Sequence, residues 1–332
     1  MAKRRRKKKG GLWGAVLVLV AAVGILFWQQ DEWREPVEDL LNTWQSAAAE
    51  DTDGSSSPSS TAQPVDGEAK IWYLDVGQAD CMLLQLPNGS GWDSILIDAG
   101  TGQTEDALCS WLEEQGVEDL TAVIATHPHE DHIGGMDAVL KAIPAESLYM
   151  PEVKESLTPT TRCYEQLLDA AKDQHVQAVK GQSGVTVYKE DGVKLELIGP
   201  EPDKEYDDLN EYSLVAKLTV GERSFLFTGD SSEQAEADML SAGEPLSADV
   251  LKVGHHGSST ATTEAFLQEV NPQVAVISCG KGNSYGHPHE ETMQRLQEKA
   301  ITIYRTDEDG TIMASCDGTS IEWQTGLPSI GE

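Results

Sequence analysis

From residue 70 onward, short apolar runs alternate with amphipathic stretches. The apolar runs have the length of buried strands, and the stretches between them have the apolar spacing of helices that cover one face of a sheet. The predicted strands are 70–75, 80–86, 92–98, 120–125, 147–150, 185–188, 193–198, 212–220, 223–228, 248–253, 273–278, 301–304, 311–315 and 319–323. The predicted helices are 104–116, 134–142, 161–174, 232–241, 262–270 and 289–299. Because the helices are spread throughout and short turns join adjacent strands near both ends, the pattern predicts an α/β domain of two mixed sheets packed face to face, with helices outside.

The N-terminal region has a different pattern. Basic residues fill positions 3–9, and an uncharged, mostly apolar run of 17 residues follows from Leu12 to Trp28. Seventeen residues is the lower limit for a membrane-spanning helix, and Trp13 and Trp28 stand at the two ends of the run, where interfacial aromatics are found. The basic residues predict a cytoplasmic N-terminus. A cleaved signal peptide is the alternative, but no good small-x-small site follows the run.

These patterns divide the chain into five parts. We expect a basic cytoplasmic tip (1–10), a transmembrane anchor (11–28), a juxtamembrane segment with a flexible linker (29–67), a large α/β domain (68–325) and a tail (326–332). The linker is rich in Ser, Thr, Asp, Gly and Pro, which is typical of a flexible tether. The sequence therefore predicts a single-pass membrane protein whose large domain is extracytoplasmic.

The charge of the chain limits its binding partners. The chain has 332 residues and a net charge of −32, and because seven of its basic residues lie in 3–9, the remainder carries −39. Such an acidic body is a poor general binder of nucleic acid. A polyanionic substrate would need local positive charge, which bound metal ions can supply.

The cysteines do not form a recognisable framework. They are odd in number, scattered, and contain no C-x-x-C pair, so buried thiols are expected, with one disulfide possible if the domain is exported. They are Cys81, Cys109, Cys163, Cys279 and Cys316.

Seven of the eight histidines fall into three short clusters. The first cluster places His127, His129, Asp131 and His132 within six residues, directly after the apolar run 120–125. A loop between a strand and a helix can aim several imidazoles and a carboxylate at one point. A metal site with an open coordination position requires this arrangement.

Three later segments supply further polar groups at strand ends. Asp230 follows an apolar strand and is either a metal ligand or the N-cap of the next helix. His255 and His256 also follow a strand, so one can ligate a metal while the other serves the substrate as acid, base or donor. His287 could bind an oxyanion, whereas His289 begins a helix and is equally a cap or a surface residue.

Together these segments predict a site for two divalent metal ions. One ion would be held by His127 and His129, and the other by Asp131, His132 and a histidine of the pair 255–256, with Asp230 bridging the two. Such a pair shares a hydroxide that attacks in line while both ions stabilise the developing charge. Nitrogen and oxygen ligands suit Zn, Mn or Fe and do not choose among them.

The motifs resemble the metallo-β-lactamase superfamily, whose H-x-H-x-D-H loop is matched by the first histidine cluster. The resemblance extends over nearly all of 70–323 and is most specific for the metallo-β-lactamase-like domain of ComEC-type DNA-uptake proteins. The matching segments are 73–80 (YLDVGQAD), 96–100 (LIDAG), 126–135 (THPHEDHIGG), 227–230 (FTGD), 248–258 (ADVLKVGHHGS) and 285–289 (YGHPH). The resemblance implies an αββα sandwich with a metal site at its edge that hydrolyses phosphodiester bonds.

The resemblance also implies roles for individual residues. The implied metal ligands are His127, His129, Asp131, His132, Asp230 and His256. The implied catalytic residues are Asp131, His255 and His287, with His255 acting on the substrate phosphate or the leaving oxygen. It places Ser213, Ser258 and Tyr285 against the substrate, and Asp75 and Asp98 behind the ligands.

The chain departs from the family pattern at several points. Ala79 replaces the second glycine of G-Q-G-D, and the interval that often holds another histidine contains only His175, which is not expected to be a ligand. Residues 210–215 match the family's N-S-L-V imperfectly, so the first metal is expected to be completed by water or to be loosely held. The many-span membrane channel of ComEC proteins is absent from this sequence. A true β-lactamase is not favoured, because the resemblance places a cysteine in those enzymes at the position where this chain has Asp230.

The sequence thus predicts a membrane-anchored, extracytoplasmic, metal-dependent phosphodiesterase or nuclease. Two alternatives stay open. The acidic body favours a smaller substrate, such as a phosphoester of the cell envelope. The missing histidine favours a non-catalytic module that works beside a separate membrane channel protein.

Overall fold

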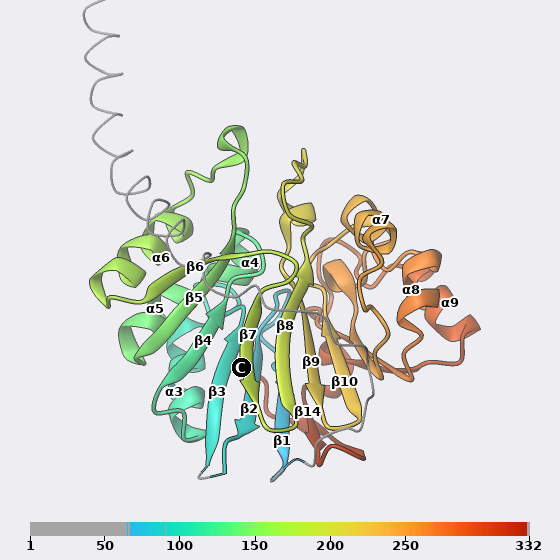
Figure 1. The fold of residues 1–332 in the computed structure, drawn as a ribbon, viewed down its shortest axis with the longest axis horizontal. Helices are drawn as coiled ribbons and strands as arrows, with labels where there is room; N and C mark the ends of the chain where they lie inside the picture. Colours follow the sequence, from blue (N-terminus) through green and yellow to red (C-terminus); the bar gives the residue numbers. More distant parts are fainter. Residues whose placement is uncertain (1–64, 66, 90, 331–332) are drawn as a thin grey trace, which may run out of the picture. The chain divides into compact units, whose positions relative to one another are not determined.

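The computed structural model describes residues 65, 67–89 and 91–330 (Figure 1). The predicted basic tip and anchor, and nearly all of the predicted linker, lie outside these residues. Within the described ranges no helix is long and apolar enough to cross a membrane.

The described part of the chain contains two β-sheets. The first has eight strands in the order β15-β14-β1-β2-β3-β4-β5-β6. Its strands are β1 (Ala69–Tyr73), β2 (Met82–Pro87), β3 (Trp92–Ile97), β4 (Leu120–Ile124), β5 (Ala145–Pro151), β6 (Gln177–Gly181), β14 (Thr311–Cys316) and β15 (Ile321–Leu327). The second sheet has seven strands in the order β13-β12-β11-β10-β9-β8-β7. Its strands are β7 (Thr186–Glu190), β8 (Val193–Gly199), β9 (Val215–Val220), β10 (Arg223–Phe227), β11 (Val250–Lys252), β12 (Val274–Ile277) and β13 (Thr302–Arg305).

Helices cover the outer faces of both sheets, which lie between them in Figure 1. The first sheet is covered by α3 (Glu105–Glu114), α5 (Met136–Ala142) and α6 (Arg162–Asp173), and the second by α7 (Glu233–Ala242), α8 (Glu264–Val270) and α9 (Glu290–Glu298). Shorter helical turns are α4 (Glu130–Ile133), α10 (Thr306–Asp309), η1 (Glu155–Leu157), η2 (Leu209–Tyr212) and η3 (Gly254–Gly257).

The alternation of side chains along the strands creates three apolar layers. On β1, Ile71 and Tyr73 pack between the two sheets, whereas Trp72 points to the outer face and meets Trp111 of α3 edge to face. On β10, Phe225 and Phe227 likewise join the central layer, while the side chain of Leu226 packs against the outer helices. The period of two in the sequence therefore produces the αββα sandwich, as predicted.

The elements differ from the prediction in a few places. Strand β6 was missed because its sequence is short and half polar, as is typical of a strand at the edge of a sheet. Helix α4 was also missed, so Asp131 and His132 lie on a helical turn rather than in a loop. The last strand continues to Leu327, two residues past the predicted domain limit.

The strand directions bring the predicted site residues to one edge. Strands β3 to β6 run parallel, and so do β10 to β13. The carboxyl ends of neighbouring parallel strands meet at one edge of a sheet, where open α/β sheets bind ligands. Segments that follow β3, β4, β10 and β11 carry the candidate ligands.

The turn after α4 requires glycine for steric reasons. A Cβ atom on Gly134 would lie 2.4 Å from the carbonyl oxygen of Glu130 and 2.7 Å from the backbone nitrogen of Gly102. The chain after β3 and the chain after β4 therefore pack backbone to backbone, which fixes α4 beside the end of β3.

Candidate metal centre

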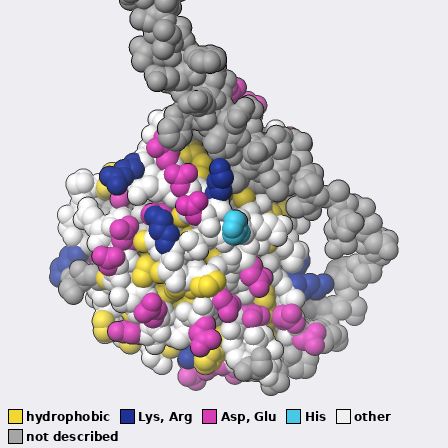
Figure 2. Space-filling model, turned by 90° about the vertical axis from the view of Figure 1, so that its left-hand side faces the viewer, with side chains coloured by type: hydrophobic (Ala, Val, Ile, Leu, Met, Phe, Trp, Pro, Cys, Tyr) yellow, Lys and Arg dark blue, Asp and Glu magenta, His cyan; other side chains and the backbone are white. Residues whose placement is uncertain are grey.

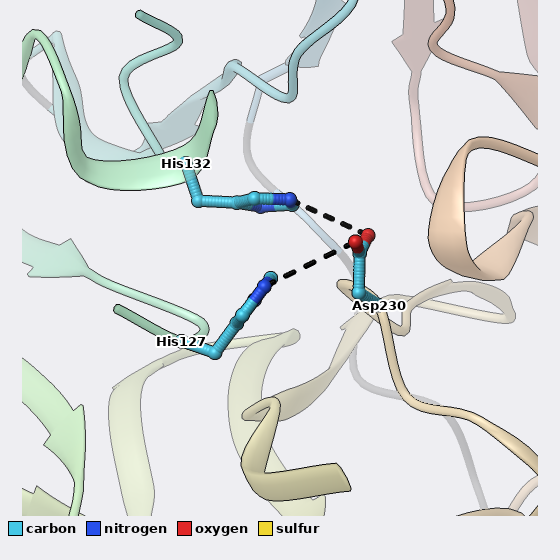
Figure 3. Close-up of side chains that lie close together, drawn as sticks. All are labelled: His127, His132 and Asp230. Carbon is cyan, nitrogen blue, oxygen red and sulfur yellow. Dashed lines mark ion pairs between the residues drawn. The ribbon is translucent and has the colours of Figure 1, made fainter. Parts of the chain in front are cut away.

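Asp230, which follows β10 of the second sheet, faces His127 and His132, which follow β4 of the first sheet (Figure 3). His132 Nε2 lies 3.4 Å from Asp230 Oδ1, and His127 Nε2 lies 3.9 Å from Asp230 Oδ2. The ligand atoms of these three buried residues all lie within 4.8 Å of one another. The first sheet supplies the two imidazoles and the second supplies the carboxylate, so the site forms only when the sandwich is assembled.

His256 and Asp131 extend this group on the side of Asp230 Oδ1. His256 Nε2 lies 3.6 Å from Asp230 Oδ1 and 3.4 Å from Asp131 Oδ2. The ligand atoms of Asp131, His132 and His256 form a second group that could hold a metal ion. Asp230 Oδ1 therefore faces His132 and His256 together.

The buried atoms of this centre fit a cation. His132 Nε2, His256 Nε2 and Asp230 Oδ1 are buried and make no hydrogen bond within the described part of the chain. A buried polar atom without a partner is costly, and a metal ion bound between such atoms removes that cost. The donor set of imidazole nitrogen and carboxylate oxygen suits a divalent cation such as Zn, Mn or Fe and does not choose among them.

Asp98 contacts the imidazole of His132 on the side away from Asp230. His132 Nδ1 lies 2.8 Å from Asp98 Oδ2. The backbone nitrogen of Thr126 donates to Asp98 Oδ1 at 2.8 Å, and the Thr126 hydroxyl donates to Asp98 Oδ2 at 2.7 Å. A carboxylate on the outer nitrogen of a ligating imidazole selects the tautomer and orients the ring.

Asp80, rather than Asp75, stands behind His256. Asp80 Oδ1 lies 3.3 Å from His256 Nδ1, which also lies 3.0 Å from the carbonyl oxygen of Ser278. The other oxygen of Asp80 lies 2.8 Å from Nζ of Lys252, and both side chains are fully buried. Sequence reasoning missed Lys252, although a lysine inside the apolar run of β11 is a signal that a buried partner exists.

The prediction for Asp75 is corrected by its contacts. Its carboxylate accepts from the backbone nitrogen of Gly77 and from the hydroxyl of Ser329, and its backbone oxygen accepts from the nitrogen of Ile330. Asp75 therefore joins the C-terminal segment to the loop after β1.

Ser213 lies behind the ligands and not against substrate, because it is fully buried. Its hydroxyl accepts from the backbone nitrogen of Asp230 at 3.1 Å and lies 3.4 Å from His127 Nδ1. Ser213 thus links the first histidine to the strand end that carries the carboxylate. Its predicted contact with substrate is corrected accordingly.

His129 occupies the margin of the centre. Its Nδ1 atom lies 2.9 Å from His127 Nε2, and its ring meets that of His127 edge to face. Among the described residues, none of the four groups of converging ligand atoms includes His129. Its predicted role as a ligand of the first metal remains a prediction.

The turn of η3 separates His255 from His256. Strand β11 ends at Lys252, before both histidines. The backbone of His255 and His256 then takes positive φ values of 50° and 52°. Strained backbone of this kind persists only where the surroundings hold it, and here the nitrogen of His255 donates to the oxygen of Gly229 at 3.0 Å. The two rings therefore diverge because of this left-handed turn and not because of strand alternation. His256 is almost fully buried, whereas the side chain of His255 is 25% exposed.

His255 approaches the other oxygen of Asp230. Its Nε2 atom lies 3.6 Å from Asp230 Oδ2 and 3.4 Å from Nδ2 of Asn210. Its Nδ1 atom lies 3.4 Å from the hydroxyl of Thr260. The ring is thus in contact with the centre on one side and with polar groups near solvent on the other.

His287 forms the outer wall of the centre. Its ring centroid lies 5.7 Å from that of His255 and 6.2 Å from that of His256. Its Nδ1 atom lies 3.4 Å from Nε2 of Gln78, a residue that sequence reasoning did not single out. Tyr285 stacks on the outer side of His287.

The remaining candidates have structural contacts. Ser258 is buried, and its hydroxyl lies 3.0 Å from that of Thr260, while its predicted contact with substrate remains a prediction. His289 stands at the N-cap position of α9 without a side-chain capping bond, and its Nδ1 atom accepts from the backbone nitrogen of Ser259 at 3.0 Å. His175 is exposed and lies outside every group of converging ligand atoms in the described residues.

The cysteines take no part in the centre. All five are free thiols, and three of them, Cys81, Cys279 and Cys316, are buried as expected.

The charges of the centre favour a bound cation. Burial opposes a charge on His256, but the carboxylates of Asp230 and Asp80 outweigh it and raise the pKa of His256 to about 10. Burial likewise opposes a charge on Asp230, but His256 and His132 hold the pKa of that carboxyl well below its usual range. The ionised carboxylates of Asp230 and Asp80 therefore favour positive charge next to them. Protons on the histidines or bound metal ions can supply this charge.

The imidazoles of His287 and His255 are neutral at neutral pH. Burial, together with the neighbouring His256 and His255, lowers the pKa of His287 to about 4. Burial also lowers the pKa of His255, although the carboxylate of Asp230 opposes this. At neutral pH both rings can therefore donate one hydrogen bond and accept another.

Comparison with known proteins identifies bacterial relatives, among them a competence protein. The chain is 33% identical over 262 residues to the ComE operon protein 3 of Bacillus subtilis, covering 74% of this chain and 33% of that protein. It is 31% identical over 251 residues to the competence protein ComA of Neisseria gonorrhoeae, covering 74% of this chain and 32% of that protein. The chain therefore spans about a third of the length of these relatives.

The solved structure of the metallo-β-lactamase fold protein YhfI from Bacillus subtilis aligns with a TM-score of 0.48 and 14% identity. The alignment covers 74% of this chain and 99% of that chain. The family model of the metallo-β-lactamase superfamily matches residues 74–281, a range that includes strands β2 to β12 and His127, Asp230 and His256. This chain belongs to the metallo-β-lactamase superfamily.

Proposed function

We propose that this chain is a metal-dependent phosphodiesterase that holds two divalent cations, Zn or Mn, on either side of Asp230. The observation that carries the proposal is that the two oxygens of Asp230 face different histidines. Oδ1 faces His132 and His256, and Oδ2 faces His127 and His255. A carboxylate in this position can bind two cations at once. Enzymes that displace a group in line at phosphorus use such paired cations.

Each residue of the centre has a separate task in this proposal. Two histidines, His127 and His129, would hold one cation, and Asp131, His132 and His256 would hold the other. When bound, the cations supply Lewis acidity and lower the pKa of a coordinated water. Asp98 and Asp80 keep the rings of their histidine partners aimed at the centre.

His255 and His287 would serve the substrate. The two rings lie edge to face with centroids 5.7 Å apart, and both are neutral at neutral pH. His255 would donate a hydrogen bond to the leaving oxygen, and His287 would donate to a non-bridging oxygen of the phosphate. Donors placed where negative charge develops stabilise the transition state more than the ground state.

Nucleic acid is the substrate class that the relatives support. One relative is named a competence protein, which is said of that protein, and the match covers about a third of its length. A β-lactam substrate is not favoured, because Asp230 stands where the resemblance places a cysteine in those enzymes.

A small or cell-envelope phosphodiester is the second candidate substrate. On the face that carries α5 and α6, acidic side chains surround the few basic ones (Figure 2). With a net charge of −39 outside the basic tip, the body gives little general attraction for a long polyanion. A third candidate, a non-catalytic module beside a separate channel protein, follows from the absence of a further histidine in the sequence.

The proposed location is the outer side of a membrane, with the predicted anchor at 11–28 holding the domain. The basic residues before the apolar run support this orientation. Protease added to intact cells should remove the domain by cutting the linker. A domain that stays intact until the cells are lysed would contradict the orientation.

The activity is tested with the full chain and bis-p-nitrophenyl phosphate. Protein stripped with EDTA should be inactive and should recover hydrolysis when Mn or Zn is added. The variant Asp230→Asn should stay at the background rate under both metals, whereas His175→Ala, which changes an exposed histidine outside the centre, should match the unchanged protein. Hydrolysis that resists EDTA, or is retained in Asp230→Asn, would contradict the proposal.

A further inference from the structure

Tyr285 is an exposed aromatic side chain at the mouth of the centre. It is 67% exposed, and the only other large hydrophobic residue exposed among the described residues is Trp92, at the start of β3. One face of the Tyr285 ring stacks on His287, with centroids 5.6 Å apart and an angle of 20° between the planes. The other face is left to solvent, so Tyr285 extends the wall of the centre outward by one ring.

The loop that carries Tyr285 is held in place by many hydrogen bonds. Asn283 Oδ1 accepts from the backbone nitrogens of Tyr285 and His287, at 3.1 and 3.0 Å. Asn283 Nδ2 donates to the oxygens of Gly280 and His287, at 2.9 and 2.6 Å. The exposed ring thus sits on an ordered support, which lowers the entropy lost when a ligand stacks on it.

The same loop is fixed against the turn that follows the two histidines. His289 Nε2 lies 3.2 Å from the oxygen of Tyr285, while His289 Nδ1 accepts from Ser259. Any Cβ atom on Gly257 would lie 2.6 Å from the Cβ of Pro288. The position of Tyr285 relative to His255 and His256 is therefore set by direct packing between the two loops.

Positive charge on this loop is slight. Lys281, four residues before Tyr285, makes no ion pair with another residue in the described ranges, and its side chain is exposed. One lysine cannot offset the acidic body, so attraction to many phosphates is not available to this site. A flat ring stacked beside the centre recognises a base through its face and requires little positive charge.

We propose that the open face of Tyr285 is a stacking platform for the nucleobase next to the scissile phosphate. This inference rests on the proposed phosphodiesterase function and names its substrate class: a single-stranded nucleic acid or short oligonucleotide. A base can reach the ring only when it is free of its own helical stack, so duplexes are poor substrates. Non-nucleotide phosphodiesters lack the group that the platform binds.

The test uses the metal-loaded full chain and two single-stranded oligonucleotides of equal length, one normal and one with every base removed. Tyr285→Ala should raise KM for the normal strand by roughly 5- to 150-fold and leave KM for the abasic strand unchanged. Tyr285→Phe and Tyr285→Trp should restore the lower KM, because stacking needs the ring and not the hydroxyl. Trp92→Ala, at the other exposed aromatic, should match the unchanged protein with both strands.

Salt dependence gives a second readout. Fluorescence anisotropy of a labelled oligonucleotide measures binding of the normal strand. The logarithm of the binding constant should fall with the logarithm of the salt concentration with a slope of about −1 or shallower, because few phosphates are contacted. Deoxyribose and ribose strands tested in parallel show which sugar the site prefers.

The outcomes separate this inference from the proposed function. If the chain hydrolyses no phosphodiester but Tyr285→Ala still weakens binding of the normal strand, the platform stands and the catalytic proposal fails. If the chain hydrolyses both strands and Tyr285→Ala changes neither KM nor binding, the platform is contradicted while the phosphodiesterase proposal stands. Equal KM values for normal and abasic strands in the unchanged protein would also overturn the platform.

Discussion

Lys252 Nζ lies 2.8 Å from Asp80 Oδ2, with both side chains fully buried beneath the metal centre. The other oxygen of Asp80 faces His256 Nδ1 at 3.3 Å. A buried ion pair is expensive to desolvate, so its presence here requires a reason beyond stability. We infer that Lys252 keeps Asp80 charged and in place behind His256.

Breaking this pair should destabilise the fold. Lys252→Met removes the buried cation beside Asp80 Oδ2, and Asp80→Asn leaves Lys252 as an unpaired buried charge, so each should lower the free energy of unfolding by about 3–5 kcal/mol. The double variant should lose less than the sum of the two single variants. Urea unfolding in EDTA measures all three proteins without metal binding.

Lys141→Met is the control for the Lys252 and Asp80 variants. Lys141 pairs with Asp137 across one helical turn, but its side chain is 53% exposed. Its loss should cost less than about 1 kcal/mol. Strict additivity of the Lys252 and Asp80 variants would contradict the coupling.

His255 and His256 should affect different steps. His256→Ala should lower metal occupancy, because its buried Nε2 atom makes no hydrogen bond in the described part of the chain and faces the carboxylates of Asp131 and Asp230. His255→Ala should retain metal and lower kcat by roughly 10²–10⁴-fold, which is typical of a lost proton donor or acceptor. Elemental analysis and kcat measured on the same preparations separate the two. Reversed effects would exchange their roles.

Metal removal should lower thermal stability. The centre brings carboxylates from both sheets together, and cations that bind only the folded state stabilise it by mass action. At 100 times Kd one ion contributes about 2.7 kcal/mol, which raises Tm by roughly 5–10 °C for a domain of this size. Calorimetry with and without EDTA measures the shift. The same shift in Asp230→Asn would show that the ion binds elsewhere.

Glu236 should make stability depend on pH. It is buried and accepts hydrogen bonds from the backbone nitrogens of Thr262 and Thr263. Burial raises its pKa from 4.5 to about 6, although those hydrogen bonds oppose the rise. The folded state therefore holds this proton more tightly than the unfolded chain does. The stabilisation is fully present below pH 4.5 and is lost as the pH rises through about 6.

The measurement is the difference in free energy of unfolding between Glu236→Gln and the unchanged protein. From pH 4.5 to pH 7 this difference should shift in favour of Glu236→Gln, by on the order of 2 kcal/mol. Glu233→Gln changes an exposed carboxyl of the same helix and serves as the control. A shift in the opposite direction, or none, would contradict the account.

The strands of the sandwich could be predicted from the sequence because burial of the sheets requires apolar residues in a regular pattern. Apolar runs such as that of β10 are continuous or alternate with a period of two, and they end in the polar residues of the site. Edge strand β6 carries no such pattern, since its residues are half exposed. Its pairing with β5 depends on tertiary contacts that a local pattern does not contain.

The candidate site was predictable where chemistry and spacing coincide. Imidazoles clustered after a strand indicate a metal site, and His127, His132 and His256 do converge with Asp230. The partners behind them were harder to identify, because an aspartate next to a strand end looks the same whether it faces the site or the surface. Asp75 and Asp80 stand five residues apart on one loop, and only the backbone path of that loop decides which one reaches His256.

The most direct test of the account is a metal titration in which occupancy and activity are measured on the same sample. Metal-free full chain is titrated with Mn or Zn, bound metal is counted per chain, and hydrolysis of a phosphodiester is followed at each step. We expect the rate to rise with occupancy and to level off at about two ions per chain, as a paired site requires. Two bound ions with no hydrolysis above the Asp230→Asn background, or full hydrolysis with no bound metal, would contradict the account.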